Sequence, residues 1–262
     1  MSTDFSLPGV IDVPSGATWD DLVLPAQSIQ RLHEYVLWVT HRDKVELEWG
    51  GRLTGGPIAL FTGPSGTGKT FAAEVLANAL GLPLFRVDLG RLVSKYIGET
   101  EKNLGALFDA VTKEPMLLLF DEADSLFGKR SDVQDAHDRY ANQEVSYLLS
   151  RLEHHKGPCI LTSNLRQDID PAFARRFQMV IDFPFPEEAA RSKLWRLHLP
   201  AGAPIDKDVD TDTLARESEL TGGQIRNAAL HAAFLAAGES SAITLKHIAS
   251  AVETELAKTG SA

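Results

Sequence analysis

Short apolar runs alternate with helical patterns through the middle of the chain. The run from Met116 to Phe120 is fully apolar, as in a parallel strand buried on both faces. Between the runs, apolar residues recur at helical spacing. The predicted strands are Ile58 to Thr62, Leu84 to Val87, Met116 to Phe120, Ile160 to Ser163 and Val180 to Phe183. This alternation predicts an α/β fold with a parallel sheet covered by helices on both faces.

The pattern changes after Pro184-Phe185-Pro186. No strand-like run follows this turn, and Thr221 and Gln224 stand at capping-box spacing before a helical stretch. The predicted helices are Glu187 to His198, Thr211 to Glu217, Gly222 to Ala237 and Thr244 to Lys258. We therefore expect a small all-helical subdomain, with the Pro-rich turn as its hinge.

The chain before the first of these strands divides into an arm and a helix. Prolines and glycines interrupt the first residues, which we interpret as a flexible extended arm or a tail bound to a partner. The helix is predicted by residues that fall on one face, namely Ile29, Leu32, His33, Val36 and Val39. The expected organisation is an arm at 1–16, a sheet-containing core at 17–185 and the helical subdomain at 186–262.

Composition and charge narrow the class of protein. Of the 262 residues, 44% are hydrophobic and 24% are charged, as in a soluble globular protein. No apolar run approaches the roughly 20 residues of a membrane span, and the first residues lack a signal-peptide pattern. Cys159 is the only cysteine, so an intrachain disulfide is impossible and we expect a reducing cytoplasm. The net charge of −10 argues against binding to duplex nucleic acid.

A phosphate-binding loop lies between the first predicted strand of the sheet and the helix after it. The loop matches the pattern G-x-x-x-x-G-K-[ST] without deviation. Its backbone N–H groups and the helix N-terminus suit phosphate groups, while the lysine adds a positive charge and the threonine hydroxyl suits Mg²⁺. The residues are Gly63, Pro64, Ser65, Gly66, Thr67, Gly68, Lys69 and Thr70. They predict binding of ATP with Mg²⁺.

Two carboxylates follow the apolar run in Leu117-Leu118-Leu119-Phe120-Asp121-Glu122. A buried parallel strand delivers them to the carboxyl edge of the sheet, where ligands bind in such folds. Asp121 can hold Mg²⁺ through its water shell, and Glu122 can orient and deprotonate an attacking water. Solvated acids at a strand end are the alternative, which the phosphate-binding loop disfavours.

In order, four segments resemble the successive motifs of AAA+ ATPases. They are Gly63 to Thr70, Leu117 to Asp124, Thr162-Ser163-Asn164 and Asp170 to Phe177. The resemblance runs from about Trp19 to Lys258. It implies a P-loop NTPase core with a five-stranded parallel sheet in αβα layers, a helical lid and a homo-oligomeric, hexameric ring.

Three polar residues take their expected roles from this resemblance. Asn164 matches sensor 1, which helps to place the water near the γ-phosphate; an Asn in a turn after a strand is the alternative. Arg175 and Arg176 match arginine fingers, which reach the γ-phosphate of a neighbouring subunit in a ring. A pair of surface arginines is the alternative, and the sequence does not decide which of the two acts.

Further resemblances rest on shorter signals. Arg226 is similar to sensor 2 on a lid helix, although a solvated helix residue fits equally well. Leu22 and Val23 resemble the segment that packs beside the adenine ring, and a core strand is an equal interpretation.

The segment containing Lys95, Tyr96 and Ile97 resembles the pore loop of rings that thread polypeptides. An aromatic side chain there would grip a chain by contact area. A tyrosine that anchors the loop to the core is the alternative. The charged stretch Gly128 to Arg139 is either a second pore or interface loop or a solvated loop.

The leading hypothesis is an oligomeric ATPase that remodels, threads or disassembles a protein or peptide substrate. Substrate choice would come from the arm, the pore or a partner. The stretch from Phe127 to Tyr147 resembles single-module bacterial ATPases, some of which are encoded with contractile injection systems. The alternatives are a P-loop phosphotransferase (kinase) and a nucleic-acid motor or loader, although the acidic charge disfavours the latter.

Overall fold

The computed structural model divides the chain into two compact units. It describes residues 10–13, 16–53, 55–89, 99–111, 115–126, 146–164, 175–258 and 260. The larger unit comprises residues 1–19, 26–63 and 69–183, and the helical unit comprises residues 20–25, 64–68 and 184–262. The division before Pro184 falls at the Pro-rich turn that the sequence pattern marks as a hinge.

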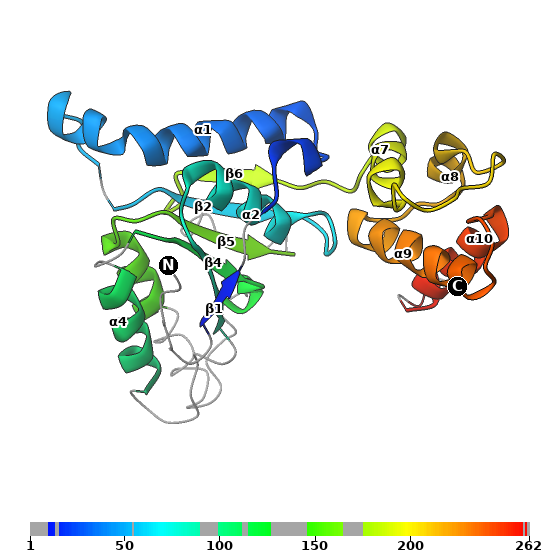
Figure 1. The fold of residues 1–262 in the computed structure, drawn as a ribbon. Coiled ribbons are helices and arrows are strands. Elements are labelled where there is room, and N and C mark those ends of the chain that lie inside the picture. Colours follow the sequence, from blue (N-terminus) through cyan, green and yellow to red (C-terminus); the bar gives the residue numbers. More distant parts are fainter. Residues whose placement is uncertain are drawn as a thin grey trace. The chain divides into compact units, whose positions relative to one another are not determined.

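Six strands form one sheet in the described part of the larger unit, in the order β1-β3-β4-β5-β2-β6 (Figure 1). β2 to β6 are mutually parallel, which confirms the predicted α/β fold with a parallel sheet. β2 and β5 are buried along their whole length, because helices cover both faces. The parallel strands are β2 (Ile58–Thr62), β3 (Leu84–Asp88), β4 (Leu117–Asp121), β5 (Cys159–Ser163) and β6 (Met179–Asp182).

Strand β1 (Val10–Val13) adds an antiparallel edge to this sheet. Val10 pairs with Val87 and Val13 with Leu84, so β1 runs against β3. The strand lies within the segment that the sequence pattern predicts to be an extended arm. Its backbone therefore caps an edge of the sheet that would otherwise present unpaired N–H and C=O groups.

The helices of the larger unit cover the two faces of the sheet (Figure 1). α1 (Ala26–Asp43) and α2 (Lys69–Leu80) lie on one side, and α4 (Glu99–Val111) lies on the other. Residues 146–154 are also helical. Leu107 of α4, Leu148 of that helix and Phe120 of β4 belong to one buried apolar cluster. Shorter turns are η1 (Trp19–Asp21), η2 (Lys44–Glu48) and η3 (Ala123–Leu126).

The buried face of α1 differs from the predicted stripe. Ser28, Leu32 and Tyr35 are its buried residues, whereas His33 is exposed. The Tyr35 hydroxyl lies 3.0 Å from two backbone carbonyl oxygens, at Pro57 and Cys159. This buried hydroxyl therefore has hydrogen-bond acceptors inside the core. His33 instead stacks on the ring of Trp19 with centroids 4.0 Å apart.

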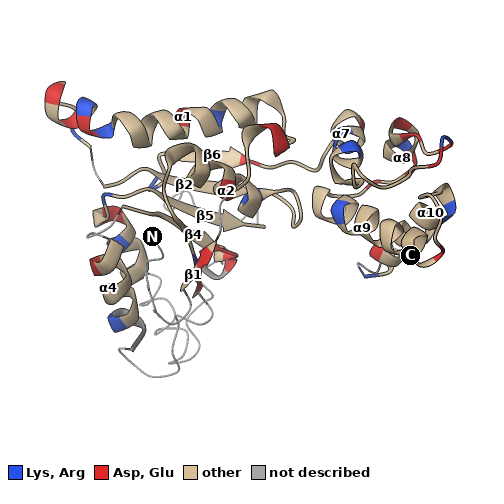
Figure 2. Cartoon of the chain, viewed as in Figure 1, with Lys and Arg blue, Asp and Glu red and all other residues tan. Residues whose placement is uncertain are grey.

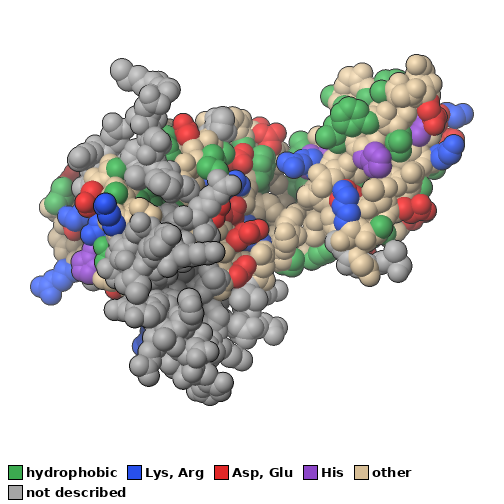
Figure 3. Space-filling view, turned by 90° about the horizontal axis from the view of Figure 1, so that it is seen from below, with side chains coloured by type: hydrophobic (Ala, Val, Ile, Leu, Met, Phe, Trp, Pro, Cys, Tyr) green, Lys and Arg blue, Asp and Glu red, His purple; other side chains and the backbone are tan. Residues whose placement is uncertain are grey.

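The helical unit packs around Trp195, whose side chain is fully buried. The capping box predicted for α9 is present, because the Thr221 hydroxyl accepts from the Gln224 N–H and the Gln224 side chain accepts from the Thr221 N–H. Hydrophobic side chains also reach its surface (Figure 3), and Leu230 and Phe234 of α9 are 51% and 69% exposed. Its helices are α7 (Glu188–His198), α8 (Thr211–Glu217), α9 (Gly222–Gly238) and α10 (Leu245–Lys258).

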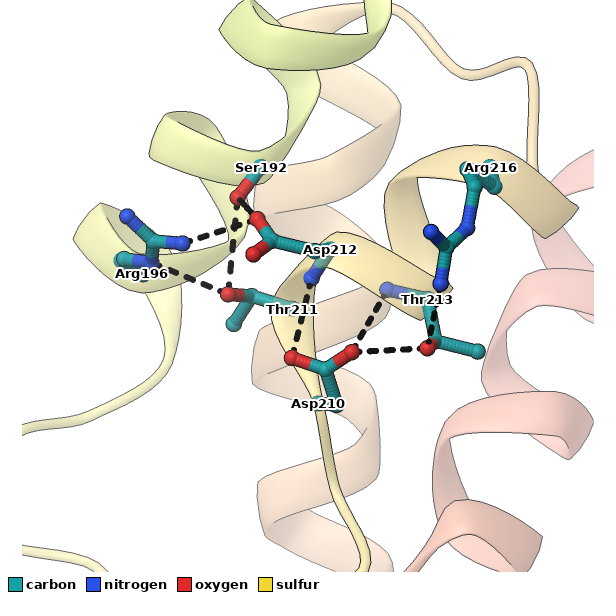
Figure 4. Close-up of polar contacts among 7 residues, drawn as sticks. All are labelled: Ser192, Arg196, Asp210, Thr211, Asp212, Thr213 and Arg216. Carbon is teal, nitrogen blue, oxygen red and sulfur yellow. Dashed lines mark hydrogen bonds and ion pairs between the residues drawn. The ribbon is translucent and has the colours of Figure 1, made fainter.

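Polar contacts fix the start of α8 against α7 (Figure 4). The carboxylate of Asp210 accepts hydrogen bonds from the N–H groups of Asp212 and Thr213, which the first turn of a helix leaves without partners. Asp212 in turn accepts from Ser192 and Arg196 of α7. The short helix α8 is therefore anchored at its N-terminal end by carboxylates on both sides.

No helix in the described part of the chain is long and apolar enough to cross a membrane.

Candidate ATP-binding and hydrolysis site

The loop after β2 turns in a way that requires glycine. Gly63 has φ 145°, and a Cβ atom there would lie 2.0 Å from the carbonyl oxygen of Phe183. The backbone directly after β6 therefore approaches too closely for any side chain at this position. The turn leads directly into α2, so the loop opens at a helix N-terminus, as an anion site requires.

Residues 64–68 of this loop belong to the helical unit. The N–H of Gly223 donates to the carbonyl oxygen of Gly66 at 2.9 Å. A Cβ atom at Gly66 would lie 2.6 Å from the Thr221 hydroxyl oxygen, and one at Gly223 would lie 3.3 Å from the Gly66 Cα. The start of α9 therefore packs directly against the backbone of Gly66 within this unit.

Lys69 begins α2 and is 7% exposed. Its Nζ donates to the carbonyl oxygen of Gly63 at 2.6 Å and to Oδ1 of Asn164 at 2.9 Å. Burial lowers the pKa of Lys69 below its ordinary value, and the nearby carboxylates, first that of Asp124, oppose this shift. The structure thus holds the ammonium group at the mouth of the loop, where phosphate groups would bind.

A hydroxyl and a carboxylate meet beside the lysine. Thr70 Oγ1 lies 3.2 Å from both carboxylate oxygens of Asp121. Arg86 approaches the same carboxylate at 3.9 Å. Hydroxyl and carboxylate oxygens are the hard donors that Mg²⁺ takes from a protein while it keeps several waters. The two side chains therefore offer donor atoms of the kind that a magnesium ion takes.

Glu122 directly follows Asp121, and its backbone is strained. Its φ is 53°, a value that few residues other than glycine adopt. Its N–H donates to Thr162 Oγ1 at 2.9 Å, and its side chain is exposed. Acidic residues lie together just after β4 (Figure 2), and the positive φ of Glu122 marks the point where the chain leaves the strand.

The tip of β5 completes this part of the site. Asn164 accepts from Lys69 through Oδ1 and donates to Asp124 through its N–H at 2.8 Å and Nδ2 at 3.1 Å. Thr162 donates to Asp121 Oδ1 at 2.7 Å. Lys69, Thr70, Asp121, Glu122 and Asn164 thus meet at the carboxyl edge of the sheet.

Comparison with known proteins identifies the family of the domain that carries these residues. Residues 59–185 match the "ATPase family associated with various cellular activities (AAA)". The chain contains an AAA-family ATPase domain. This assignment agrees with the α/β core that carries the phosphate loop and the two carboxylates, and ATP hydrolysis is the activity of such a domain.

Relatives of the AAA domain come from distant organisms. An uncharacterised AAA family ATPase, y4kL, of Sinorhizobium fredii is 37% identical over 180 residues, which are 68% of this chain and 53% of that protein. The cell division cycle protein 48 homologue of Archaeoglobus fulgidus is 33% identical over 238 residues, 88% of this chain and 32% of that protein. Human vacuolar protein sorting-associated protein 4A is 35% identical over 166 residues, 62% of this chain and 38% of that protein. The chain spans about half or less of the length of these relatives.

The two candidate arginine fingers of the AAA domain differ in their contacts. Both are exposed and line one pocket with Glu153 and Gln178. Arg176 forms an ion pair with Glu153 at 3.1 Å, and each side chain is about 40% exposed. None of the pocket residues belongs to the phosphate loop. Both arginines are therefore presented on a surface, as a contact with a second subunit requires.

The candidate adenine and lid contacts fall in the helical unit. Val23 packs against the apolar cluster around Trp195. The alternative of a core strand at Leu22 and Val23 is wrong, because residues 22–25 have no regular secondary structure. Arg226 is exposed near the start of α9. The pKa of His198 is lowered first by the burial of His198 and second by the positive charge of Arg226.

Several predicted residues lie outside the described part of the chain. They are the candidate pore residues Lys95, Tyr96 and Ile97 and the charged stretch 128–139. Conversely, the sequence pattern indicates no role for Thr162 or Asp124. Both stand within the AAA+-like motifs, but only the fold shows which partners their oxygens have.

Proposed function

We propose that the AAA domain hydrolyses Mg²⁺-bound ATP within a ring of identical subunits and couples hydrolysis to the remodelling or threading of a protein. The observation that carries the proposal is the convergence of Lys69, Thr70 and Asp121 beside Glu122. The hydroxyl of Thr70 and the carboxylate of Asp121 lie 3.2 Å apart, which suits a shared ion. We place this activity in the cytoplasm.

Each residue of the site has a distinct task in this proposal. Lys69 would exchange its contacts with Gly63 and Asn164 for oxygens of the β- and γ-phosphates. Thr70 and Asp121 would hold Mg²⁺, which neutralises charge on those phosphates. Glu122 would accept a proton from the water whose oxygen attacks the γ-phosphorus, while the bond to the bridging oxygen breaks and ADP leaves.

The exposed arginines support the assembly of a ring. A head-to-tail arrangement of subunits would carry Arg175 and Arg176 to the γ-phosphate bound by a neighbour. An arginine supplied in trans raises hydrolysis by about 10³–10⁵-fold in small GTPases. Because Arg176 is paired with Glu153, we propose Arg175 as the residue that reaches the phosphate and Arg176 as its support.

The remodelling of proteins is supported by the resemblance of the Tyr96 segment to pore loops. The ring could serve assembly or recycling of a contractile injection system, as the resemblance of residues 127–147 to such ATPases suggests. Leu22 and Val23 would contact adenine, and Arg226 would sense the phosphates from α9. The substrate in this proposal is a polypeptide, which the aromatic side chain of Tyr96 would grip by contact area.

Glu122→Gln tests the ring. The amide keeps the size of the side chain but cannot accept the proton, so ATP should bind and persist. If ATP binds the assembled ring better than the free subunit, it must stabilise the ring by mass action. Light scattering after gel filtration with ATP and Mg²⁺ should show a ring, near six subunits by the family resemblance. A monomer under these conditions contradicts the ring and favours a monomeric phosphotransferase.

Tyr96→Ala tests the coupling to protein. A permanently unfolded model polypeptide should accelerate ATP hydrolysis by the parent protein and by the control Tyr96→Phe, which keeps the aromatic ring. Tyr96→Ala should keep basal hydrolysis and lose the acceleration. Loss of basal hydrolysis would instead make Tyr96 a core anchor. Acceleration by DNA in place of the polypeptide would favour the nucleic-acid motor.

A further inference from the structure

The carboxylate of Asp124 gathers three hydrogen bonds from the end of β5. Ser163 Oγ donates to Oδ1 at 2.6 Å, and the Asn164 N–H donates to the same oxygen at 2.8 Å. The third donor is Asn164 Nδ2, which lies 3.1 Å from Oδ2. Asp124 therefore holds Asn164 at both its backbone and its side chain.

These contacts determine which end of the Asn164 amide faces the phosphate loop. An ionised carboxylate only accepts hydrogen bonds, and an ammonium group only donates them. Nδ2 therefore belongs at Asp124, and Oδ1 belongs at Lys69 Nζ, 2.9 Å away. A flipped amide would place oxygen against the carboxylate and NH₂ against the ammonium group, so both neighbours oppose it.

Lys69 makes this orientation matter for the reaction. It is buried and donates to the Gly63 carbonyl oxygen as well as to Asn164. Its ammonium group is the only described side-chain cation among Gly63 to Thr70. A change in the Asn164 amide therefore acts directly on the group that contacts the phosphates.

We propose that Asp124 is a positioning residue for ATP hydrolysis, because it fixes Asn164 with its oxygen toward Lys69 and the reacting phosphate. In this arrangement Asn164 serves the site as a hydrogen-bond acceptor. Its Oδ1 receives a hydrogen from Lys69 and, once Lys69 contacts phosphate, is free to receive one from the attacking water. The inference rests on the ATPase site and is independent of the ring and of any protein substrate.

The first test is Asp124→Asn. The new side chain can still accept from Ser163 and from the Asn164 N–H, but its NH₂ faces the NH₂ of Asn164. Basal kcat should fall by about tenfold or more while the KM for ATP changes less than about threefold, the pattern of a contact needed in the transition state. The control is Asp109→Asn, which removes an exposed carboxylate paired with Arg151 and should leave kcat unchanged.

The second test exchanges donor and acceptor. Asn164→Asp places two carboxylates face to face and should also slow hydrolysis. In the double variant Asp124→Asn, Asn164→Asp, the NH₂ of residue 124 again meets an oxygen of residue 164, whose other oxygen faces Lys69. The double variant should be at least about fivefold faster than either single variant, because coupled residues compensate one another.

A residue that only supports the fold would not give this rescue. The inference is overturned if Asp124→Asn keeps the parental kcat, or if the double variant is no faster than the slower single variant. Should Asp124→Asn fail to fold, the comparison of Asn164→Asp with the double variant decides in the same way. All rates are basal, without added protein, and Lys69→Ala sets the background. Parental activity in Lys69→Ala would instead refute the ATP site itself.

Discussion

The Thr162 hydroxyl donates a hydrogen bond to Asp121 Oδ1 at 2.7 Å. Thr162 Oγ1 itself accepts the N–H of Glu122 at 2.9 Å. One hydroxyl on β5 therefore fixes two consecutive residues at the end of β4. This contact helps to hold Glu122 at its positive φ of 53°.

Thr162→Val should impair both carboxylates. Valine has the same shape but leaves the Glu122 N–H without the Thr162 oxygen and removes one hydrogen bond from the Asp121 carboxylate, which keeps its contact with Thr70. Unfolding free energy should fall by about 1–3 kcal/mol, the usual cost of an unpaired buried group. Urea titration and the Mg²⁺ dependence of hydrolysis measure the two effects. Thr162→Ser keeps the hydroxyl, so its stability and its Mg²⁺ dependence should change less than those of Thr162→Val. Equal changes in the two variants would argue that the methyl group, not the hydroxyl, matters.

Gly223→Ala should weaken ATP binding, whereas its neighbour Gly222→Ala should not. The Cβ of alanine at 223 would lie 3.3 Å from the Gly66 Cα, so the phosphate loop must shift by a few tenths of an ångström. At 222 the nearest atom would be 3.5 Å away, an ordinary contact. Titration with a fluorescent ATP analogue should give a raised Kd for the first variant only. Similar affinities would show that the loop adapts without cost.

His155 should make the fold sensitive to acid. Burial, with a smaller contribution from Arg151, lowers the pKa of His155 to about 4. The unfolded chain binds the proton near the ordinary pKa of about 6.5, so unfolding free energy should fall as the pH decreases from 6.5 toward 4. Above that range both states are neutral at this residue and the contribution is constant.

The comparison variant is His155→Gln, which cannot gain a charge. Its urea midpoint should depend less on pH between 6.5 and 4 than that of the parent. His154→Gln changes the exposed neighbouring histidine and should keep the parental dependence. The hypothesis fails if the two variants lose stability with acid to the same extent.

The strands of the core could be predicted because a strand that is buried on both faces has apolar residues at every position, which gives a short apolar run in the sequence. β2 begins and ends where the pattern places it, at Ile58 and Thr62, and the other parallel strands differ by about one residue. β1 could not be predicted in this way, since an edge strand buries little and Val10–Val13 has no buried residue. Tyr35 was missed on α1 because its hydroxyl finds two carbonyl groups that only the folded chain brings near it.

The candidate site likewise contains residues that the sequence predicts and residues whose roles only the fold shows. Lys69, Thr70, Asp121 and Glu122 stand in local motifs whose spacing has a direct chemical reason. The contributions of Thr162 and Asp124 depend on the pairing of β4 with β5, which brings residues 121–124 beside residues 162–164. The difference between Arg175 and Arg176 also needs the fold, because Glu153 is distant in sequence.

A mixture of two inactive subunits tests the shared ATP site most directly. One carries Arg175→Ala and Arg176→Ala with an intact Glu122, and the other carries Glu122→Gln with both arginines. Each alone should hydrolyse ATP very slowly while it binds ATP within a few-fold of the parent. In mixed rings, an intact Glu122 can face the intact arginines of its neighbour, so hydrolysis should recover in part. No recovery in rings shown by mass measurement to be mixed, or parental hydrolysis by the arginine variant alone, would contradict the account.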